Sequence, residues 1–356
     1  MGANGFKRKE TSPNHLSKTI GCMLGGAVGN ALGAPVEFLD IDEICDRYGT
    51  PGITRLEEAY GRIGAITDDT QMSLFTAEGL ILSTVRREYA EFRLTIPAIY
   101  HANLRWLYTQ ETQIQAQLIK SHGTCSVVDG ILTGHKALFS KRSPDETCLA
   151  ALRSGQMGTL DQPINQSKGC GGVMRAAPIG LAFADPEEAF LRGCESAAIT
   201  HGHPTGYLAA GCFASLISRI LSGASLVDAI SDTIPLLKAH KNFEDCLNSI
   251  EAAVSLSSSS EITPEDIKTL GGGWIAEEAL AIGICCALTA DDDFRRCVLM
   301  AVNHSGDSDS TGSLAGNLLG VQYGMETLPD DWLSGLEMKD VITEVASDLA
   351  DTFADN

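Results

Sequence analysis

The chain has 356 residues and a formal net charge of −20, because 46 acidic side chains outnumber 26 basic ones. A charge of this sign disfavours binding to nucleic acid or to an anionic membrane, so neither is expected as a partner. Hydrophobic residues form 44% of the chain and aromatic residues only 6%, while 36 glycines allow backbones to approach closely, which together favours a core of packed helices.

The first segment, residues 1–17, is polar and locally basic. This composition is typical of a flexible or loosely docked tail. Helical patterning follows over the rest of the chain, without a composition change that would mark a domain boundary. We therefore expect a tail over residues 1–17 and one domain over residues 18–356.

Helix-start signals recur in that domain, each with a capping residue, a proline and following acids: "SPDET" at 143–147, "DPEEA" at 185–189 and "TPEDI" at 263–267. Apolar residues at helical spacing occur over residues 74–85 and 226–234. Sustained strand alternation is scarce. The sequence therefore predicts a single all-α domain.

Eleven cysteines are present without CxxC spacing, and several lie in apolar runs such as "GICCAL" at 283–288. This pattern indicates buried free thiols in a reducing cytoplasm rather than disulfides or a zinc site. The longest apolar run, residues 279–290, is shorter than the ~18 residues that a membrane-spanning helix requires. A cytoplasmic protein is expected.

Polar clusters interrupt the apolar helical background at two places in the first eighty residues. In "GNALGAPVEF", residues 29–38, Glu37 is a lone acid between two apolar residues, a pattern more typical of a surface position. In "TDDT", residues 67–70, four oxygen-bearing side chains open an apolar helix. Taken alone, that second cluster is typical of an N-cap whose acids complement the helix dipole.

Two further clusters lie in the second half of the chain. In "SKGCGGVMRAAPIG", residues 167–180, three glycines expose backbone N–H groups that are suited to an anion. In "NHSGDSDSTGSLAGNLLG", residues 303–320, two aspartates and following hydroxyls begin a helix. This second cluster is not an EF-hand, because Leu318 stands where that loop needs a bidentate Glu.

The five residues "DSDST" also resemble the DxDxT nucleophile motif of haloacid-dehalogenase-like phosphatases. Too few residues follow Thr311 for the parallel α/β domain of those enzymes, so this function is kept as a weaker alternative. His201 and His203 lack a third ligand at zinc spacing, and we expect them to cap a helix or to contact a ligand.

Together, "TDDT" and "GDSDST" supply four carboxylates and several hydroxyls. These hard oxygen donors suit Mg²⁺, Mn²⁺ or Ca²⁺ rather than zinc. Clustered acids repel one another when they are buried, and two divalent ions would cancel that charge. We therefore expect the two motifs to share one metal centre.

Six motifs in order resemble the ADP-ribosylglycohydrolase family, and they extend from about residue 18 to about residue 335: "GGAVGNALGAPVEF", "ITDDTQM", "SKGCGGVMRAAPIGLA", "ITHGHPTGY", "GGGWIAEEALAIGI" and "VNHSGDSDSTGSLAGNLLGVQYG". The resemblance implies an all-α fold, a compact multi-helix orthogonal bundle with a dinuclear metal cleft. It also implies two Mg²⁺ ions, or Mn²⁺, and hydrolysis of the bond between ADP-ribose and a modified protein side chain.

Carried over residue by residue, the resemblance implies six metal ligands: Thr67, Asp68, Asp69, Asp307, Asp309 and Ser310. Asp309 is the expected bridge between the two ions. The expected catalytic residues are Glu37, which matches the acid near the scissile ribose, and Asp307. The expected substrate-binding residues are Asn30, Gly169, Gly171, Gly172 and His201.

Three features depart from the family pattern. Asn30 stands where the family commonly has Asp, and Cys170 replaces an Asn of the glycine loop. Between residues 100 and 135 the family often has an Asp-Ile-Gly motif near the ribose, whereas the nearest feature here is "VVDG" with Asp129. Ser310 stands where the family usually has Thr and keeps the hydroxyl. None of these changes removes a carboxylate from the expected metal centre.

We therefore expect a Mg²⁺-dependent hydrolase that removes ADP-ribose from modified proteins, with arginine the favoured linkage and serine-linked or O-acetyl-ADP-ribose as open alternatives. A different class remains possible on the sequence alone: an immunity-type protein that binds ADP-ribose or an ADP-ribosyltransferase without turnover. The basic residues 7–9 of the tail are suited to docking on a cognate ADP-ribosyltransferase.

Overall fold

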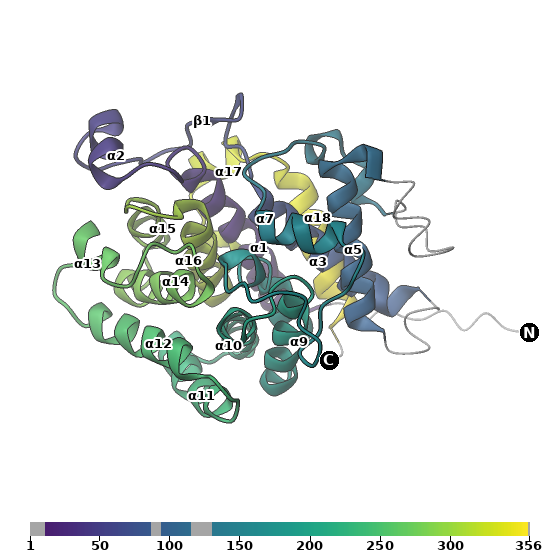
Figure 1. Ribbon diagram of the computed structural model, residues 1–356. Coiled ribbons are helices and arrows are strands. Elements are labelled where there is room, and N and C mark those ends of the chain that lie inside the picture. Colours follow the sequence, from purple (N-terminus) through teal and green to yellow (C-terminus); the bar gives the residue numbers. More distant parts are fainter. Residues whose placement is uncertain (1–10, 87–93, 115–129, 355–356) are drawn as a thin grey trace, which may run out of the picture.

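The protein is all-α apart from one short hairpin, as the sequence predicts, and the computed structural model describes residues 11–86, 94–114 and 130–354 (Figure 1). In the first half of the chain the α-helices are α1 (Pro13–Gly33), α2 (Ile41–Tyr48), α3 (Asp68–Val85), α5 (Thr95–Gln110), α7 (Glu146–Arg153) and α8 (Ala177–Ala182). The hairpin pairs β1 (Glu58–Ala59) with β2 (Arg62–Ile63) in antiparallel register.

The second half continues with α9 (Pro186–Ala198), α10 (Pro204–Leu221), α11 (Leu226–Lys238), α12 (Glu244–Ser257), α13 (Pro264–Lys268) and α14 (Ala276–Ala290), followed by α15 (Phe294–Val302), α16 (Ser308–Tyr323), α17 (Asp330–Gly335) and α18 (Lys339–Thr352). Short 3₁₀ turns connect them: η1 (Thr112–Ile114), η2 (Leu132–Gly134), η3 (Lys136–Leu138), η4 (Cys170–Gly172) and η5 (Met325–Thr327).

Helices begin at all three predicted starts, α7, α9 and α13, but α7 begins later in its motif than predicted, because Asp145 rather than Ser143 is its N-cap and Pro144 precedes the helix. Asp145, Asp185 and Thr263 are the N-caps, and each side chain accepts a backbone N–H of the first turn. A proline opens α9 and α13. These starts depend on contacts within one turn of the chain, which is why local sequence predicts them.

Helices α1 and α16 pack side by side at the centre of the fold, and glycines allow their backbones to touch (Figure 1). A Cβ added at Gly25 would lie 2.4 Å from the carbonyl oxygen of Gly316, and one added at Gly29 would lie 1.9 Å from that of Gly312. Neither position has room for any other residue. This close approach brings the end of α1 against the start of α16, where the polar motifs of both helices meet.

The expected tail overlaps the first helix. Residues 1–10 lie outside the described residues, whereas α1 already begins at Pro13 with Ser12 as its N-cap. Thr11 donates a hydrogen bond to Asp351 at 2.8 Å. The part of the expected tail from residue 13 to 17 is therefore helical, and the boundary at Lys18 stays a proposal about domain organisation.

The described helices include none whose length and hydropathy together would allow it to span a lipid bilayer.

Candidate active site

Four aspartates from two helix starts converge at the floor of a cleft. Asp68 and Asp69 begin α3, Asp307 is the N-cap of α16, and Asp309 lies in the first turn of that helix. Each exposes at most 3% of its surface. All four line a cleft of about 360 Å³ whose wall also includes Glu37.

Hydrogen bonds tie the two helix starts to the end of α1. The N–H of Thr67 donates to Oδ1 of Asn30 at 2.8 Å, and its hydroxyl donates to Asp309 Oδ2 at 2.7 Å. Ser310 Oγ donates to Asp69 Oδ1 at 2.8 Å. Thr67 makes no side-chain capping bond to α3, so its hydroxyl serves the carboxylate cluster rather than its own helix.

Asn30 lies behind the carboxylates rather than in the cleft. Its amide nitrogen is 2.6 Å from Thr67 Oγ1 and 3.3 Å from Asp309 Oδ2, and the side chain is fully buried. An amide can both accept from Thr67 and donate to Asp309, which a carboxylate could not do. Asn30 therefore orients two of the expected metal ligands, and it does not line the substrate space.

Burial raises the pKa of all four aspartates, and repulsion by a neighbouring aspartate raises the pKa of Asp68, Asp69 and Asp307 further. In the described part of the chain no lysine or arginine pairs with any of them. A cluster of buried acids without a cation is costly. The cluster therefore fits hard divalent cations, which prefer carboxylate and hydroxyl oxygens.

Glu37 follows α1 and faces the same cleft. Its Oε1 accepts a hydrogen bond from Ser143 Oγ at 2.9 Å, while its buried Oε2 has no partner. Ligand oxygens of Glu37, Asp307 and Asp309 all lie within 4.8 Å of one another. Burial, with repulsion from Asp309 and Asp307, raises the pKa of Glu37 to about 11. The unpartnered oxygen is a second sign that a cation or a polar substrate group belongs in this space.

Residues 142–145 form a brace that holds three parts of the site in place, although the sequence predicts only a helix start here. Arg142 donates to the carbonyl of Ile66 at 2.9 Å, and the N–H of Asp145 donates to Asp68 Oδ2 at 2.9 Å. Between them, Ser143 holds Glu37 and has a left-handed backbone, with φ 50°. Such a conformation is disfavoured in a residue other than glycine and is often retained where function requires it.

Glu337, which precedes α18, completes that brace from the other end of the chain. It forms a buried ion pair with Arg142 and accepts the N–H of Ile66 at 3.2 Å. The N–H and the carbonyl of Ile66 are thus both held by hydrogen bonds, directly before the metal motif begins at Thr67. No local signal in the sequence connects Glu337 to this loop.

We expect Glu337→Gln to weaken both the fold and metal binding. Loss of the charge leaves Arg142 buried without a counter-ion, which costs about 3–5 kcal/mol of unfolding free energy. Because Ile66 is then held less firmly, Mg²⁺ affinity should also fall. Denaturant unfolding and calorimetric Mg²⁺ titration measure the two effects. Glu57→Gln, which removes an exposed pair with Arg55, is the control, and an equal effect of both variants would contradict the proposed brace.

The glycine loop packs against helices rather than lining the cleft. A Cβ at Gly171 would lie 2.6 Å from Asp145 Oδ2, and one at Gly172 would lie 2.9 Å from the Cβ of Ala197 in α9. Within this loop, Cys170 is the residue that lines the cleft. Close packing therefore explains why residues 171 and 172 are glycines. An anion-binding role for Gly169, Gly171 and Gly172 stays a prediction.

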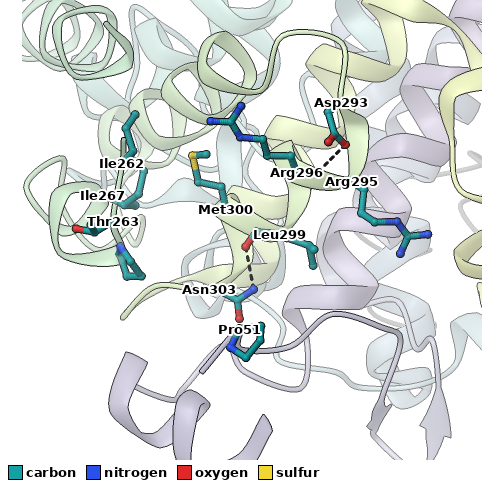
Figure 2. Close-up of a pocket in the computed structure, with 11 residues that line it drawn as sticks. Pro51, Ile262, Thr263, Ile267, Asp293, Arg295, Arg296, Leu299, Met300 and Asn303 are labelled. Atoms are coloured by element: carbon teal, nitrogen blue, oxygen red, sulfur yellow. Dashed lines mark hydrogen bonds between the residues drawn. The ribbon is translucent and has the colours of Figure 1, made fainter. Parts of the chain in front are cut away.

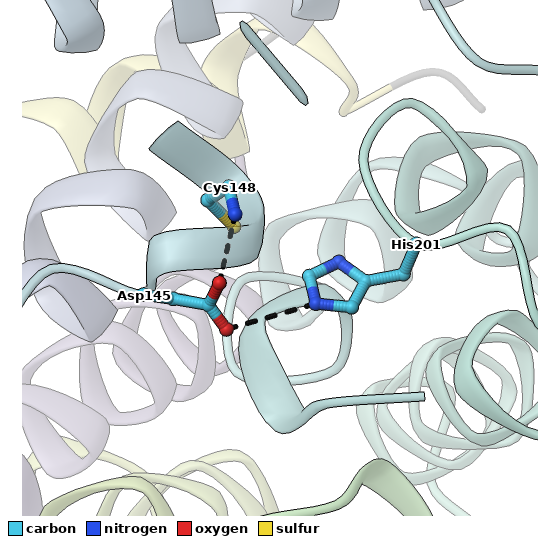
Figure 3. A group of neighbouring side chains, drawn as sticks. All are labelled: Asp145, Cys148 and His201. Carbon is cyan, nitrogen blue, oxygen red and sulfur yellow. Dashed lines mark hydrogen bonds and ion pairs between the residues drawn. The ribbon is translucent and has the colours of Figure 1, made fainter. Parts of the chain in front are cut away.

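His201 lies behind Asp145 and is fully buried (Figure 3). Its Nε2 is 3.6 Å from Asp145 Oδ2, and its Nδ1 is 2.9 Å from Thr200 Oγ1. Burial raises the pKa of Asp145, but interaction with His201 and the N–H of Cys148 outweighs it and holds the pKa at about 2. His201 does not line the cleft itself. It keeps Asp145, which does line the cleft, ionised and in place.

The same group of Asp145, Cys148 and His201 does not fit a second metal. Arg175 donates to Cys148 Sγ at 3.1 Å and to Thr200 Oγ1 at 2.7 Å. A buried guanidinium in contact with the thiol already supplies the positive charge and would repel a metal ion. This cluster therefore supports Asp145 rather than forming its own centre.

A larger cavity of about 500 Å³ lies elsewhere, between α13, α15 and the segment around Pro51 (Figure 2). Its acid, Asp293, accepts the N–H of Arg296 as an N-cap. Asn303 uses its amide on the carbonyls of Ile53 and Leu299. Among the residues drawn, no group of titratable side chains converges, so the cleft above α3 and α16 is the better candidate for chemistry.

The chain is similar to known proteins over most of its length. A sequence model of the ADP-ribosylglycohydrolase family matches residues 11–356. The ADP-ribosyl-[dinitrogen reductase] glycohydrolase of Rhodospirillum rubrum is 27% identical over 92% of this chain and 93% of its own. Human ADP-ribosylhydrolase ARH3 is 25% identical over 92% of both chains.

A relative named ADP-ribosylarginine hydrolase Tri1, from Serratia proteamaculans, is 23% identical over 94% of this chain and 79% of its own. Among solved structures, a chain of an ADP-ribosylglycohydrolase-related protein complex superposes with a TM-score of 0.62 and 23% identity, covering 95% of this chain and 98% of that one. This likeness shows that the two chains share a fold.

Proposed function

The chain belongs to the ADP-ribosylglycohydrolase family, and from that premise we propose that it releases ADP-ribose from arginine side chains of modified proteins in a Mg²⁺-dependent reaction. Hydrolysis of an ADP-ribose linkage follows from the family. The metal and the linkage are our proposals. The observation that carries the metal is the convergence of four buried aspartates, without a cationic partner among the described residues, beside the unpartnered oxygen of Glu37.

Two Mg²⁺ ions, or Mn²⁺, would be held by Thr67, Asp68, Asp69, Asp307, Asp309 and Ser310. When bound, they supply positive charge that orients the vicinal hydroxyls of a ribose. The hydrogen bonds from Asn30, Thr67 and Ser310 already fix the carboxylate oxygens in place. Such preorganisation lowers the cost of positioning the sugar for reaction.

Cleavage at the ribose C1″ atom develops oxocarbenium character, which an acidic cleft stabilises. Glu37 is the residue for this task, because it lines the cleft and Ser143 holds one of its oxygens while the other has no hydrogen-bond partner. That free oxygen can accept a proton from an attacking water, or it can stabilise the positive charge on the sugar. Both roles need Glu37 to be ionised, so the bound cations must offset the burial and repulsion that raise its pKa in the metal-free protein.

The mouth of the cleft supports arginine as the leaving side chain. Phe38 and Trp274 are exposed there, with ring centroids 5.8 Å apart and an interplanar angle of 18°. A guanidinium is planar and cationic, so it stacks on aromatic faces and is attracted to an acidic cleft. A serine hydroxyl would gain neither interaction. Two relatives are also named as arginine hydrolases.

The linkage is tested by incubating the protein with Mg²⁺ and either arginine-linked or serine-linked ADP-ribosylated substrate. We expect free ADP-ribose from the arginine substrate at a rate at least ~10-fold higher, about 1.4 kcal/mol of transition-state discrimination. Equal rates, or faster release from serine, would overturn the arginine assignment and leave the hydrolase assignment intact. Binding of both substrates without release would support sequestration instead.

We expect Mg²⁺ to stabilise the fold, because it binds carboxylates that are assembled only in the folded state. At 100 times its dissociation constant the unfolding free energy should rise by about 2.7 kcal/mol. The measurement is thermal unfolding of EDTA-stripped protein with Mg²⁺ added back. An unchanged melting temperature at saturating Mg²⁺ would mean that the aspartates serve only as helix caps.

The stabilisation should grow with pH. The aspartates and Glu37 have pKa values raised in the folded state, so the metal-free folded protein binds more protons than the unfolded chain above the unfolded pKa values of about 4. Stability of the metal-free protein therefore falls as pH rises through that region. Mg²⁺ replaces those protons, and melting temperatures with Mg²⁺ should depend less on pH.

A further inference from the structure

Cys170 lies inside the cleft, unlike the other described cysteines. Its Sγ is 2.9 Å from Asp307 Oδ2 and 3.7 Å from Ser310 Oγ, and both partners belong to the carboxylate cluster. The backbone holds it there, since its N–H donates to the carbonyl of Trp274 at 3.1 Å and its own carbonyl accepts the N–H of Val173 at 2.9 Å. The thiol is thus a fixed part of the cleft wall.

An independent feature of the same cleft indicates a ligand beside this thiol. Glu37 exposes only 6% of its surface, and its Oε2 has no hydrogen-bond partner. Glu37 and Cys170 line the same cleft, and ligand oxygens of Glu37 and Asp307 lie within 4.8 Å of each other. A buried, unpartnered carboxylate oxygen next to a second carboxylate calls for a cation, and Cys170 Sγ lies 2.9 Å from Oδ2 of that second carboxylate, Asp307.

We propose that Cys170 is a sulfur ligand of the metal centre, so that the position beside Asp307, which holds Mg²⁺ in the reaction proposed above, also binds thiophilic divalent cations such as Co²⁺, Zn²⁺ or Cd²⁺, and binds them more tightly than oxygen ligands alone would. This inference rests on the metal centre proposed above and adds one sulfur ligand to its oxygen ligands. Thiolate is a soft ligand that favours the later transition metals, whereas Mg²⁺ prefers oxygen.

Binding would convert the thiol to a thiolate. The S–H bond breaks, the proton leaves to solvent, and the sulfur lone pair forms the bond to the cation, so that no oxidant or reductant is required. Asp307, which accepts from the thiol in the metal-free protein, becomes free to contact the same cation.

The test uses EDTA-stripped full-length protein titrated with Co²⁺, whose thiolate complexes show sulfur-to-metal charge-transfer absorption in the near ultraviolet. We expect this band in the wild-type protein at stoichiometric Co²⁺ and its loss in both Cys170→Ser and Cys170→Ala. Calorimetry should show Cd²⁺ affinity reduced at least ~10-fold in Cys170→Ser, with a smaller change for Mg²⁺. Circular dichroism of each variant checks that the helices remain.

Cys45→Ser is the matched control, because Cys45 is the cysteine of the described residues that is not buried and is therefore the one most open to adventitious metal. It should keep the band. Co²⁺ binding to the wild-type protein without the band, or a band that persists in the Cys170 variants, would overturn the sulfur ligand and leave the metal centre intact. No Co²⁺ binding at all would overturn both.

Discussion

Asp309→Asn should reduce hydrolysis of ADP-ribosylated substrate by more than ~100-fold while leaving the helical content unchanged. Asp309 accepts from Thr67, Asn30 and Ser310, so it touches more of the cluster than its neighbours do. The Asn side chain has nearly the same shape, and with its carbonyl oxygen in the place of Oδ2 it can still accept from Thr67 and Asn30. The variant therefore removes a metal-facing charge without removing core packing.

Two further readouts distinguish a metal ligand from a structural residue. Because one of four mutually repelling acids becomes neutral, metal-free Asp309→Asn should be at least as stable as the metal-free wild type, and Mg²⁺ should no longer raise its melting temperature. Asp307→Asn should weaken Mg²⁺ binding less if Asp309 bridges the ions. Asp293→Asn, at the N-cap of α15 outside the cleft, is the control. Equal calorimetric affinities of the Asp307 and Asp309 variants would contradict the bridging role.

Glu37→Gln should lower kcat by ~10²–10⁴-fold, the usual range for loss of an acid–base group. Gln keeps the size of the side chain and can still accept from Ser143 Oγ, but it can neither take a proton nor stabilise a cationic sugar. The four aspartates are untouched, so Mg²⁺ should still raise the melting temperature of this variant. Stopped assays of ADP-ribose release at saturating substrate give kcat, and thermal unfolding gives the metal response.

Ser143→Ala separates the charge of Glu37 from its orientation. It keeps the carboxylate and removes the hydrogen bond at Oε1, so kcat should fall less than in Glu37→Gln. If Glu37→Gln keeps wild-type kcat, Glu37 is not the acid–base group. If it instead loses the Mg²⁺ response, Glu37 is a metal ligand in its own right.

The sequence predicted the features that depend on neighbouring residues. The N-caps of α7, α9 and α13 are set within one helical turn, and the all-α class follows from helical periodicity and the scarcity of strand patterns. The two acidic motifs were visible because each is a short run of carboxylates and hydroxyls. Their order along the chain, together with the four other motifs, gave the family.

The supports of the site could not be predicted, because they come from positions far apart in the chain. Glu337 reaches Ile66, and Ser143 reaches Glu37, only after the helices have packed. Asp145 appeared as an acid of a helix start, although its N–H also holds Asp68. Cys170 appeared as a substitution in the glycine loop, without a sign that its thiol contacts Asp307. In each case one residue serves both local structure and the cleft, and the sequence pattern reveals only the local role.

The most direct test of the proposed function is the release of free ADP-ribose from an arginine-ADP-ribosylated protein by metal-stripped enzyme, with Mg²⁺ then titrated back. If the aspartate cluster holds the catalytic metal, stripped enzyme should release no ADP-ribose above background, and Mg²⁺ should restore release over the same concentrations that raise the melting temperature. Release at an undiminished rate by thoroughly stripped enzyme would contradict the metal-dependent mechanism.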